Sequence, residues 1–321
     1  MRSGMVFFVV VLCHASIPLV LADDREEFLA FVSEATERYR SSIMMGEYDI
    51  ITQRPTFFRL EKVQFREWES VIEMSSATEI LSDADCQYWQ DSGKFPRDIA
   101  LNLIGVRGET SDYRYSLLFK DGSTVGSTIS NLEVFSDNME GEIVPTAIYA
   151  PFALGGSGFA ADSVRAGTLQ VLSWGLDEKS GLWLGKFRDV RDSAGGYEMQ
   201  AYFDSDDRRI RKWFLFYDQS VISMLENEYK DGELYRARNF VPSKSPGDEA
   251  LVPHETFYYG KLSKKQVDPS TFRLSHYGHP EPALPMKKRK WDNGFTLWVI
   301  IPVLGVIALI LARQINRKKG L

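Results

Sequence analysis

Apolar and polar side chains alternate through most of the chain, and this period of two constrains the fold more than any other feature. In "DYRYSLLFKDGSTVGSTIS" the alternation runs up to Asp121-Gly122, and in "LENEYKDGELYRARNF" it runs up to Asp231-Gly232. An Asp-Gly pair between alternating runs is among the strongest local signals for a β-hairpin. The sequence therefore predicts a fold built mostly of antiparallel strands.

The stretch "GYEMQAYFDSDDRRIRKWFLFYD" predicts one of these hairpins in more detail. A four-residue turn at Asp204–Asp207 would place Phe203 opposite Arg208. Side chains two residues apart then share a face, and the face so defined is apolar: Tyr197, Met199, Ala201, Phe203, Ile210, Phe214 and Phe216. The other face carries Glu198, Gln200 and Tyr202 beside Arg209, Arg211 and Trp213. One apolar and one polar face is typical of an antiparallel sheet that is covered on one side.

Two segments have helical patterning. In "DDREEFLAFVSEATERYRSSI" the apolar residues recur at helical spacing, with acids first and arginines last: Phe28, Phe31, Val32, Ala35 and Tyr39. The second segment, "ADSVRAGTLQVLSWGL", lies between a glycine-rich loop, "PFALGGSGFAA", and an expected strand, "GLWLGKFRDV". The fold class is therefore α+β and mostly antiparallel β, with an N-terminal and a mid-chain helix packed on one face of the sheet.

Both ends of the chain are hydrophobic. Residues 1–22 predict a secretory signal peptide, with a basic start, an apolar middle and Val20 and Ala22 before the cleavage point. Residues 295–312 are uncharged and span roughly 27 Å as a helix, close to the roughly 30 Å hydrocarbon core of a bilayer. This predicts one transmembrane helix, with a basic cytoplasmic tail over residues 313–321. The alternatives are a retained N-terminal anchor and a buried C-terminal helix.

These ends place a β-rich domain over residues 23–265 outside the cytoplasm, periplasmic or at the cell surface. Residues 266–294 contain several prolines and a basic run and predict an extended linker. Removing Arg2, the eight basic residues after position 286 and Asp292 from the totals of 38 basic and 44 acidic residues leaves 29 and 43. A domain with a net charge of about −14 repels phosphate backbones, so no nucleic-acid partner is expected.

No constellation of catalytic or metal-binding residues stands out. His276 and His279 form an H-x-x-H pair, but in a proline-rich segment without a third ligand. The acids at Asp204–Asp207 fit a hairpin turn better than a calcium loop. Cys86 is flanked by acids that disfavour a thiolate, and as the single cysteine after residue 22 it cannot form an internal disulfide. We therefore predict no metal, no cofactor and no enzymatic activity; a hydrolase without these patterns is the remaining alternative.

The layout resembles the LolA/LolB-like family of bacterial lipoprotein carriers. The resemblance is carried by "EEFLAFVSEATERYRSSI" leading into "FREWESVIEM", then by "RRIRKWFLFYDQ" and "NEYKDGELYRARNF". The tail "VDPSTFRLSHYGHPEP", followed by a membrane helix, is similar to membrane-anchored LolA-like proteins of planctomycete-type bacteria. The resemblance implies a curved sheet, or half-barrel, whose apolar concave face lies beneath helices and takes up acyl chains. It transfers no individual site residue to this chain.

Two functions remain open at this point. The first is a single-pass membrane protein that binds a hydrophobic ligand, a lipid or an acylated protein, in the half-barrel. Its cavity candidates are Tyr197, Met199, Phe203, Ile210, Phe214 and Phe216, with a gate loop containing Gly155, Gly156 and Gly158. The second is an interaction scaffold of the cell envelope with a filled core, because 20 Phe, 14 Tyr and 7 Trp also suit an ordinary core. The oligomeric state stays open.

Overall fold

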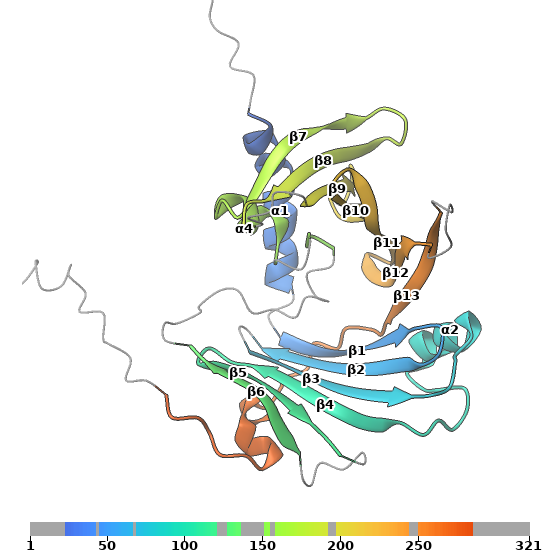
Figure 1. Cartoon of the computed structure of the whole chain (residues 1–321), viewed down its shortest axis with the longest axis vertical. Coiled ribbons are helices and arrows are strands. Elements are labelled where there is room, and N and C mark those ends of the chain that lie inside the picture. Colours follow the sequence, from blue (N-terminus) through green and yellow to red (C-terminus); the bar gives the residue numbers. More distant parts are fainter. Residues whose placement is uncertain are drawn as a thin grey trace, which may run out of the picture.

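The described residues form a single sheet of thirteen antiparallel strands that curves around an N-terminal helix (Figure 1). The structure is a computed structural model, and it describes residues 23–42, 45–66, 69–120, 127–135, 151–154, 158–191, 197–243 and 250–284. The strands lie side by side in the order β6-β5-β4-β3-β2-β1-β13-β12-β11-β10-β9-β8-β7. The predicted class, α+β with a mostly antiparallel curved sheet, is confirmed.

The strands follow the chain in two runs that meet where β1 pairs with β13. The first run is β1 (Met45–Gln53), β2 (Phe58–Arg66), β3 (Glu69–Ala77), β4 (Asn102–Glu109), β5 (Tyr113–Leu118) and β6 (Thr128–Val134). The second run is β7 (Leu169–Asp177), β8 (Leu182–Asp189), β9 (Tyr197–Phe203), β10 (Ile210–Tyr217), β11 (Ser220–Lys230), β12 (Glu233–Pro242) and β13 (Leu251–Tyr259).

Helix α1 (Asp24–Ser42) lies in the concavity of the sheet (Figure 1), as the pattern of its apolar residues predicted. Its acidic first turn suits the positive end of the helix dipole. The Phe28 ring is fully buried and meets the rings of Trp174, Phe187 and Phe203 at centroid distances of 5.1, 5.1 and 5.8 Å. The concave face of β7–β10 is thus filled by the side chains of α1.

The predicted second helix is much shorter than its sequence pattern. Helix α4 (Ala160–Arg165) has only six residues, and Leu169–Asp177 is strand β7. The reason is Gly167, which adopts a positive φ of 72° and ends the helix. The following residues then gain hydrogen bonds to β8 along almost their whole length. Arg40 of α1 pairs with Asp162 of α4, which fixes the short helix against the long one.

Helix α2 (Asp83–Ser92) lies on the convex side of the sheet, and the periodicity did not predict it. Ser82 and Asp85 form a reciprocal capping box, and Gly93 ends the helix with a φ of 70°. Cys86 and Trp89 pack against Ile51, Leu60 and other residues of the convex face. A local S-x-x-D signal, rather than an apolar stripe, marks where this helix begins.

The predicted extended linker does not begin at residue 266. Two 3-10 helices, η1 (Pro269–Phe272) and η2 (Leu274–Tyr277), lie on the convex face of β3–β5. Val267, Phe272 and Leu274 are buried there with Tyr113 and Tyr115. Pro269 begins the first of these short helices, and three apolar side chains thereby gain a place in the core.

Two hairpin predictions are confirmed. Strands β11 and β12 join through Asp231 and Gly232, both at positive φ (53° and 81°), as a type I′ turn requires. Strands β5 and β6 pair antiparallel, although their Asp121-Gly122 turn lies outside the described residues. The predicted signal peptide, transmembrane helix and basic tail, at 1–22, 295–312 and 313–321, also lie outside them. Within the described residues no helix combines the length and apolar content that crossing a bilayer requires.

The two runs of strands are buried on opposite faces of the sheet. In β7–β10 the concave face is buried beneath α1, whereas in β1–β5 the convex face is buried beneath α2, η1 and η2. Strand β1 lies where the cover changes sides and buries both faces. Tyr48 and Ile50 point toward the side of α1, and Ile51 points toward α2.

Candidate functional site: a cleft at the junction of two sheet halves

The predicted cavity residues do not share one face. Met199, Phe203 and Ile210 are buried with Phe28 in the cluster beneath α1. Phe214 and Phe216 lie on the convex face, opposite Gln200 and Glu198 of β9. Tyr197 stands at the end of β9 with 39% of its surface exposed, against Tyr217. The structure therefore brings together three of the six residues and separates the rest.

The register of the β9–β10 hairpin explains this correction. Phe203 pairs with Ile210 instead of Arg208, and the register shifts again between Ile210 and Lys212. Arg208 takes a positive φ of 61°, and its amide bonds to the Asp204 carbonyl, so the turn is longer than four residues. A one-residue change in register moves every later side chain to the opposite face. Trp213 and Leu215 consequently occupy the concave positions predicted for Phe214 and Phe216.

The predicted gate loop is only partly described. Gly155 and Gly156 lie outside the described residues, whereas Gly158 has a positive φ of 87° with open space around its missing side chain. The residues flanking this stretch are anchored: Leu154 and Phe159 are buried, and the Ala160 amide bonds to the Phe152 carbonyl at 2.9 Å. The gating role itself stays a prediction.

The sheet opens where its two halves meet. Strands β12 and β13 pair as far as Arg236 and Tyr258, and beyond this point the chain follows β1. The Gly260 amide bonds to the Asp49 carbonyl at 2.8 Å, and Ser263 exchanges two backbone hydrogen bonds with Glu47. The β11–β12 turn therefore projects beyond the last β12–β13 pair and faces the segment after β13, which pairs with β1 instead.

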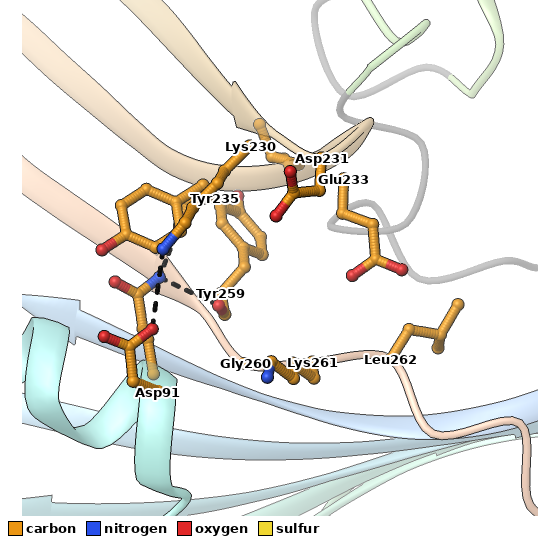
Figure 2. A pocket seen from close by; sticks show the side chains of 11 residues that line it. Asp91, Lys230, Asp231, Glu233, Tyr235, Tyr259, Gly260, Lys261 and Leu262 are labelled. Carbon is orange, nitrogen blue, oxygen red and sulfur yellow. Dashed lines mark hydrogen bonds and ion pairs between the residues drawn. The ribbon is translucent and has the colours of Figure 1, made fainter.

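A cleft occupies this opening, and we call it the seam cleft. It holds two adjoining pockets of about 390 and 370 Å³. Both pockets are lined by Asp231, Glu233, Leu234, Tyr259, Gly260 and Leu262. The first extends along the concave side to Tyr39, Ser42, Tyr48, Pro151, Arg209 and Lys264. The second, drawn in Figure 2, extends toward the last turn of α2 and includes Gln90, Asp91, Lys230, Tyr235 and Lys261.

Tyrosines form the inner wall of the first pocket. Burial raises the pKa of Tyr39, Tyr48 and Tyr259 well above that of a free phenol, so all three stay neutral hydroxyl groups at any physiological pH. Arg209 partly opposes this effect at Tyr39, and Glu233 adds to it. The Tyr48 side chain is 8% exposed, and within the described part of the chain its hydroxyl has no hydrogen-bond partner. The pocket therefore combines aromatic surface with an uncommitted donor.

Gln90 holds the second pocket open at its inner end. Its Nε2 donates to the Tyr235 and Tyr259 carbonyls at 2.7 and 2.9 Å, which ties α2 to the point where β12 and β13 part. At the rim, Lys230 approaches Asp91 at 3.7 Å (Figure 2). The resulting pocket is polar at its mouth, and the Tyr235 and Tyr259 rings are drawn beside it in Figure 2.

The residues that were considered for catalysis or metal binding make contacts of a structural kind. Burial, followed by Asp83 and Asp85, raises the pKa of Cys86 to about 12, and its thiol contacts Gln53 at 3.3 Å. The predicted direction is confirmed, with burial the larger cause. His279 bonds to the Ser127 hydroxyl at 2.7 Å. The acids after β9 lie in the β9–β10 turn, where Asp204 accepts from two backbone amides and pairs with Arg211.

Within the described residues no group of three His, Cys, Asp or Glu side chains converges on one point. Sequence reasoning missed the seam cleft almost completely. Tyr39 was identified as part of a helical stripe, but Tyr48, Leu234 and Tyr259 were not singled out. One local signal was available: Asp231-Gly232 marks the tip of the hairpin that overhangs the cleft. Part of the facing surface, Tyr39, Ser42 and Tyr48, comes from residues more than 180 positions earlier in the chain, which no local pattern encodes.

This architecture, an antiparallel sheet curved around an N-terminal helix, defines the half-barrel class. Among solved structures, the chain is similar to the LolA superfamily protein of Nitrosomonas europaea, with 10% identity and a TM-score of 0.40. A Vibrio parahaemolyticus domain, described as an outer membrane lipoprotein-sorting protein, and a DUF1329 family protein of Desulfovibrio piger each give 9% identity and a TM-score of 0.36.

Each of these alignments covers 79% of this chain and 99 to 100% of the other. No protein-family model and no curated protein sequence matches the chain. The predicted resemblance to LolA-like proteins is confirmed, and it concerns the fold alone.

Proposed function

We propose that this protein is a non-catalytic binding protein that holds the apolar part of an amphipathic ligand in the seam cleft. The ligand is a lipid or the acyl chain of an acylated protein. The domain is delivered across a membrane by the signal peptide at residues 1–22. It is then held outside the cytoplasm, in the cell envelope, by the transmembrane helix at residues 295–312.

One observation carries the proposal: aromatic and aliphatic side chains line a pocket on the concave side of the sheet, together with Tyr48, whose buried hydroxyl has no hydrogen-bond partner among the described residues. Its volume of about 390 Å³ lies within the roughly 300–1,000 Å³ typical of small-molecule sites. A buried polar group without a partner costs free energy, and a ligand that supplies an acceptor removes this cost. An ester or amide carbonyl beside an acyl chain has the required chemistry.

Binding would be driven by removing apolar surface from water, at about 25 cal/mol per Å² buried. Tyr39, Tyr259 and Leu234 offer such surface within the cleft. The charged rim, with Arg209, Asp231 and Glu233, would keep the polar end of the ligand in solvent. An amphipathic ligand matches this arrangement better than a wholly apolar one.

The predicted cavity residues could contact a ligand only after a conformational change. Met199, Phe203 and Ile210 can reach a ligand only if Phe28 leaves the space it fills beneath α1. The first pocket begins at Tyr39 and Ser42 in the last turn of α1, so an acyl chain seated there would lie at the end of the covered groove. Extension of the ligand into that groove stays a prediction.

The test uses residues 23–284, which contain every described strand and every buried cluster. The domain is purified from a membrane-containing host, weighed by native mass spectrometry, and then denatured and extracted for lipid. We expect a stoichiometric mass excess that extracts as lipid. It should be lost in Leu234→Glu, which places a charge inside the cleft, and kept in Leu118→Glu, which changes a leucine that is 55% exposed and does not line the cleft.

A bare polypeptide mass that stays unchanged after incubation with lipid would overturn the proposal. Circular dichroism of both variants serves as the folding control, because Leu234 and Leu118 are both partly or largely exposed. Tyr48→Phe tests the contribution of the ligand's polar group separately from that of its apolar chain. It should weaken binding of an acyl ester and leave binding of a plain alkyl chain nearly unchanged.

The alternative function, an interaction scaffold of the cell envelope, is favoured by a different observation. On the concave face of β7–β10, Phe28 packs into a buried aromatic cluster with Trp174 and Phe187, as in an ordinary filled core. If the mass measurement finds no lipid, the filled core and acidic surface make the scaffold the better description.

A further inference from the structure

The convex face of strands β8–β12 carries a continuous row of apolar side chains. The strand register places Phe214 opposite Met224, and Met224 opposite Phe240, so these three cross neighbouring strands in line. Leu184 and Tyr202 pair with each other on the same face, and Phe216 follows Phe214 two residues along. We call this set the convex patch: Leu184, Tyr202, Phe214, Phe216, Met224 and Phe240.

The aromatic rings of the convex patch pack against one another. The Phe214 ring lies 6.2 Å from both the Tyr202 and the Phe216 rings. All six side chains are half-buried, although no described helix lies on this part of the sheet. The corresponding face of β1–β5 is covered by α2, η1 and η2. The patch is therefore an aromatic surface that the described part of the chain leaves without a cover.

The charges around the patch differ from those of the rest of the domain. Basic side chains outnumber acidic ones on the convex face of β8–β12: Lys186, Arg188, Lys212, Arg236 and Arg238 against Glu198, Glu226 and Glu228. The domain as a whole has 43 acidic and 29 basic residues over positions 23–286, after the subtraction given above from the totals of 44 and 38. The basic excess is thus local to the patch.

Two of these cations have no carboxylate partner. The arginines pair with the three glutamates, whereas Lys186 and Lys212 form no ion pair with any described residue. The Lys212 Nζ lies 4.4 Å from the Tyr202 ring centroid and 5.7 Å from that of Phe214. An ammonium group placed over two rings at a solvent-exposed face keeps its charge available for an anion.

We propose that the convex patch rests on the surface of a bilayer that contains anionic lipids. Aromatic side chains interleaved with lysine and arginine are typical of protein surfaces at the membrane–water interface. Anionic headgroups would attract Lys186 and Lys212 and repel the acidic remainder of the domain, so the charge distribution selects this face alone. The inference is independent of the seam cleft, which is lined by the β11–β12 turn and by none of the six patch residues.

The experiment uses the chain without its predicted signal peptide, residues 23–321, reconstituted into phosphatidylcholine vesicles with or without phosphatidylglycerol. A fluorophore is attached at Gln200→Cys on the convex face or at Leu118→Cys on the concave face of β5, since Cys86 is buried. Lipids with a nitroxide headgroup act as the quencher. We expect stronger quenching at position 200 than at position 118 in vesicles with phosphatidylglycerol, and loss of this difference in high salt.

Lys186→Gln and Lys212→Gln should each weaken docking about fivefold, since a basic residue near an anionic surface contributes about 1 kcal/mol. Equal quenching at positions 200 and 118 in both lipid mixtures would overturn the proposal. Cross-linking between position-200 cysteines of two copies, without quenching, would also overturn it and would assign the patch to self-association. Phe240→Ser tests the apolar contribution separately, because it leaves every charge in place.

Discussion

The two halves of the sheet bury opposite faces, although they are continuous and share one strand order. In the β7–β10 half, an aromatic cluster forms on the concave side around Phe28. In the β1–β5 half, Tyr113 and Tyr115 are buried on the convex side beneath the segment that contains Phe272. The β7–β10 half is therefore a one-sided antiparallel sheet, whereas β1 and β2 are buried on both faces, since Val63 and Phe65 form a concave cluster with Tyr48. The unusual feature is the change of side between the two halves.

This change of side explains why the candidate site lies at the junction. Helix α1 covers the concave face of β7–β10, and α2, η1 and η2 cover the convex face of β1–β5. The strands between these two regions have few buried side chains. Only Asn227 of β11, Ala237 of β12 and Tyr258 of β13 are fully buried in these three strands. By contrast, β1 is buried on both faces. The seam cleft forms between a well-packed strand and a poorly covered hairpin.

The largest expected effect comes from Phe28→Ala, which empties the concave cluster. Removing a fully buried phenylalanine ring should lower the free energy of unfolding by about 4 kcal/mol, from lost burial and the cavity left behind. Chemical denaturation monitored by tryptophan fluorescence measures it, since Trp174 contacts this ring. Phe214→Ala, on the uncovered convex face, should cost far less.

Leu274→Ala is the matched change in the other half and should cost about 3 kcal/mol. If the halves unfold as one cooperative unit, both variants shift the same transition. Two separate transitions, each sensitive to only one variant, would show that the halves are independent and that the junction is a hinge.

Gly108→Ala should cost about 2 kcal/mol by overpacking the convex cluster. A methyl group at position 108 would stand 2.1 Å from the Tyr115 ring, which must move out of its buried site. Gly175→Ala is the control, because nothing lies within 4 Å of the added group there. Thermal unfolding compares the two, and equal melting temperatures would show that the Tyr115 ring is not held as tightly as its burial indicates.

The strands and the first helix could be predicted because their signals are local. Asp231-Gly232 specifies its hairpin through the positive φ of both residues, and Phe28 and Val32 mark the buried stripe of α1. The predicted second helix was too long because a six-residue helix is followed, after residues 166–168, by a strand of similar apolar content, and Gly167 is the signal that ends the helix. The α2 helix has no apolar stripe of sufficient length and is recognisable only by its capping box.

The site could not be predicted because it depends on register and on distant contacts. One bulge, between Ile210 and Lys212, decides whether Phe214 faces α1 or the outer side. The hydrophobic pattern of β10 is apolar on both faces, with Trp213 and Leu215 between the phenylalanines, so it does not fix the register. Tyr48 and Leu234 meet at the cleft only through the pairing of β1 with β13.

Ser82→Ala should cost about 1 kcal/mol, because it removes the capping box of α2. The effect should be local: amide hydrogen exchange in α2 should accelerate, and with it exchange near Tyr259, whose carbonyl accepts from Gln90. Gln87→Ala, which changes an exposed side chain in the middle of the same helix, is the control. Uniform acceleration across the whole sheet would mean that α2 is part of the global core and does not act as a local brace of the cleft.

The smallest expected effect concerns pH and the attachment of the C-terminal segment. Glu281 accepts hydrogen bonds from the Tyr113 hydroxyl and from the Ser275 amide, the latter at 2.8 Å. Burial acts to raise the pKa of Glu281, but these bonds and nearby Arg273 outweigh it and hold the pKa below its usual value of 4.5. The stabilisation is therefore complete above that usual value and is lost as the pH falls through the lowered one.

Because Glu281 is largely exposed, this contribution should be well below 1 kcal/mol. Hydrogen exchange at Leu274 and Ser275 should accelerate below about pH 4, after correction for the intrinsic rate, while exchange in β8 and β9 stays constant. Glu281→Gln should give the faster exchange already at neutral pH and remove its acid dependence. An acid dependence that persists in this variant would assign the effect to the pairs that Arg273 forms with Glu69 and Asp112, which also hold this segment to the sheet.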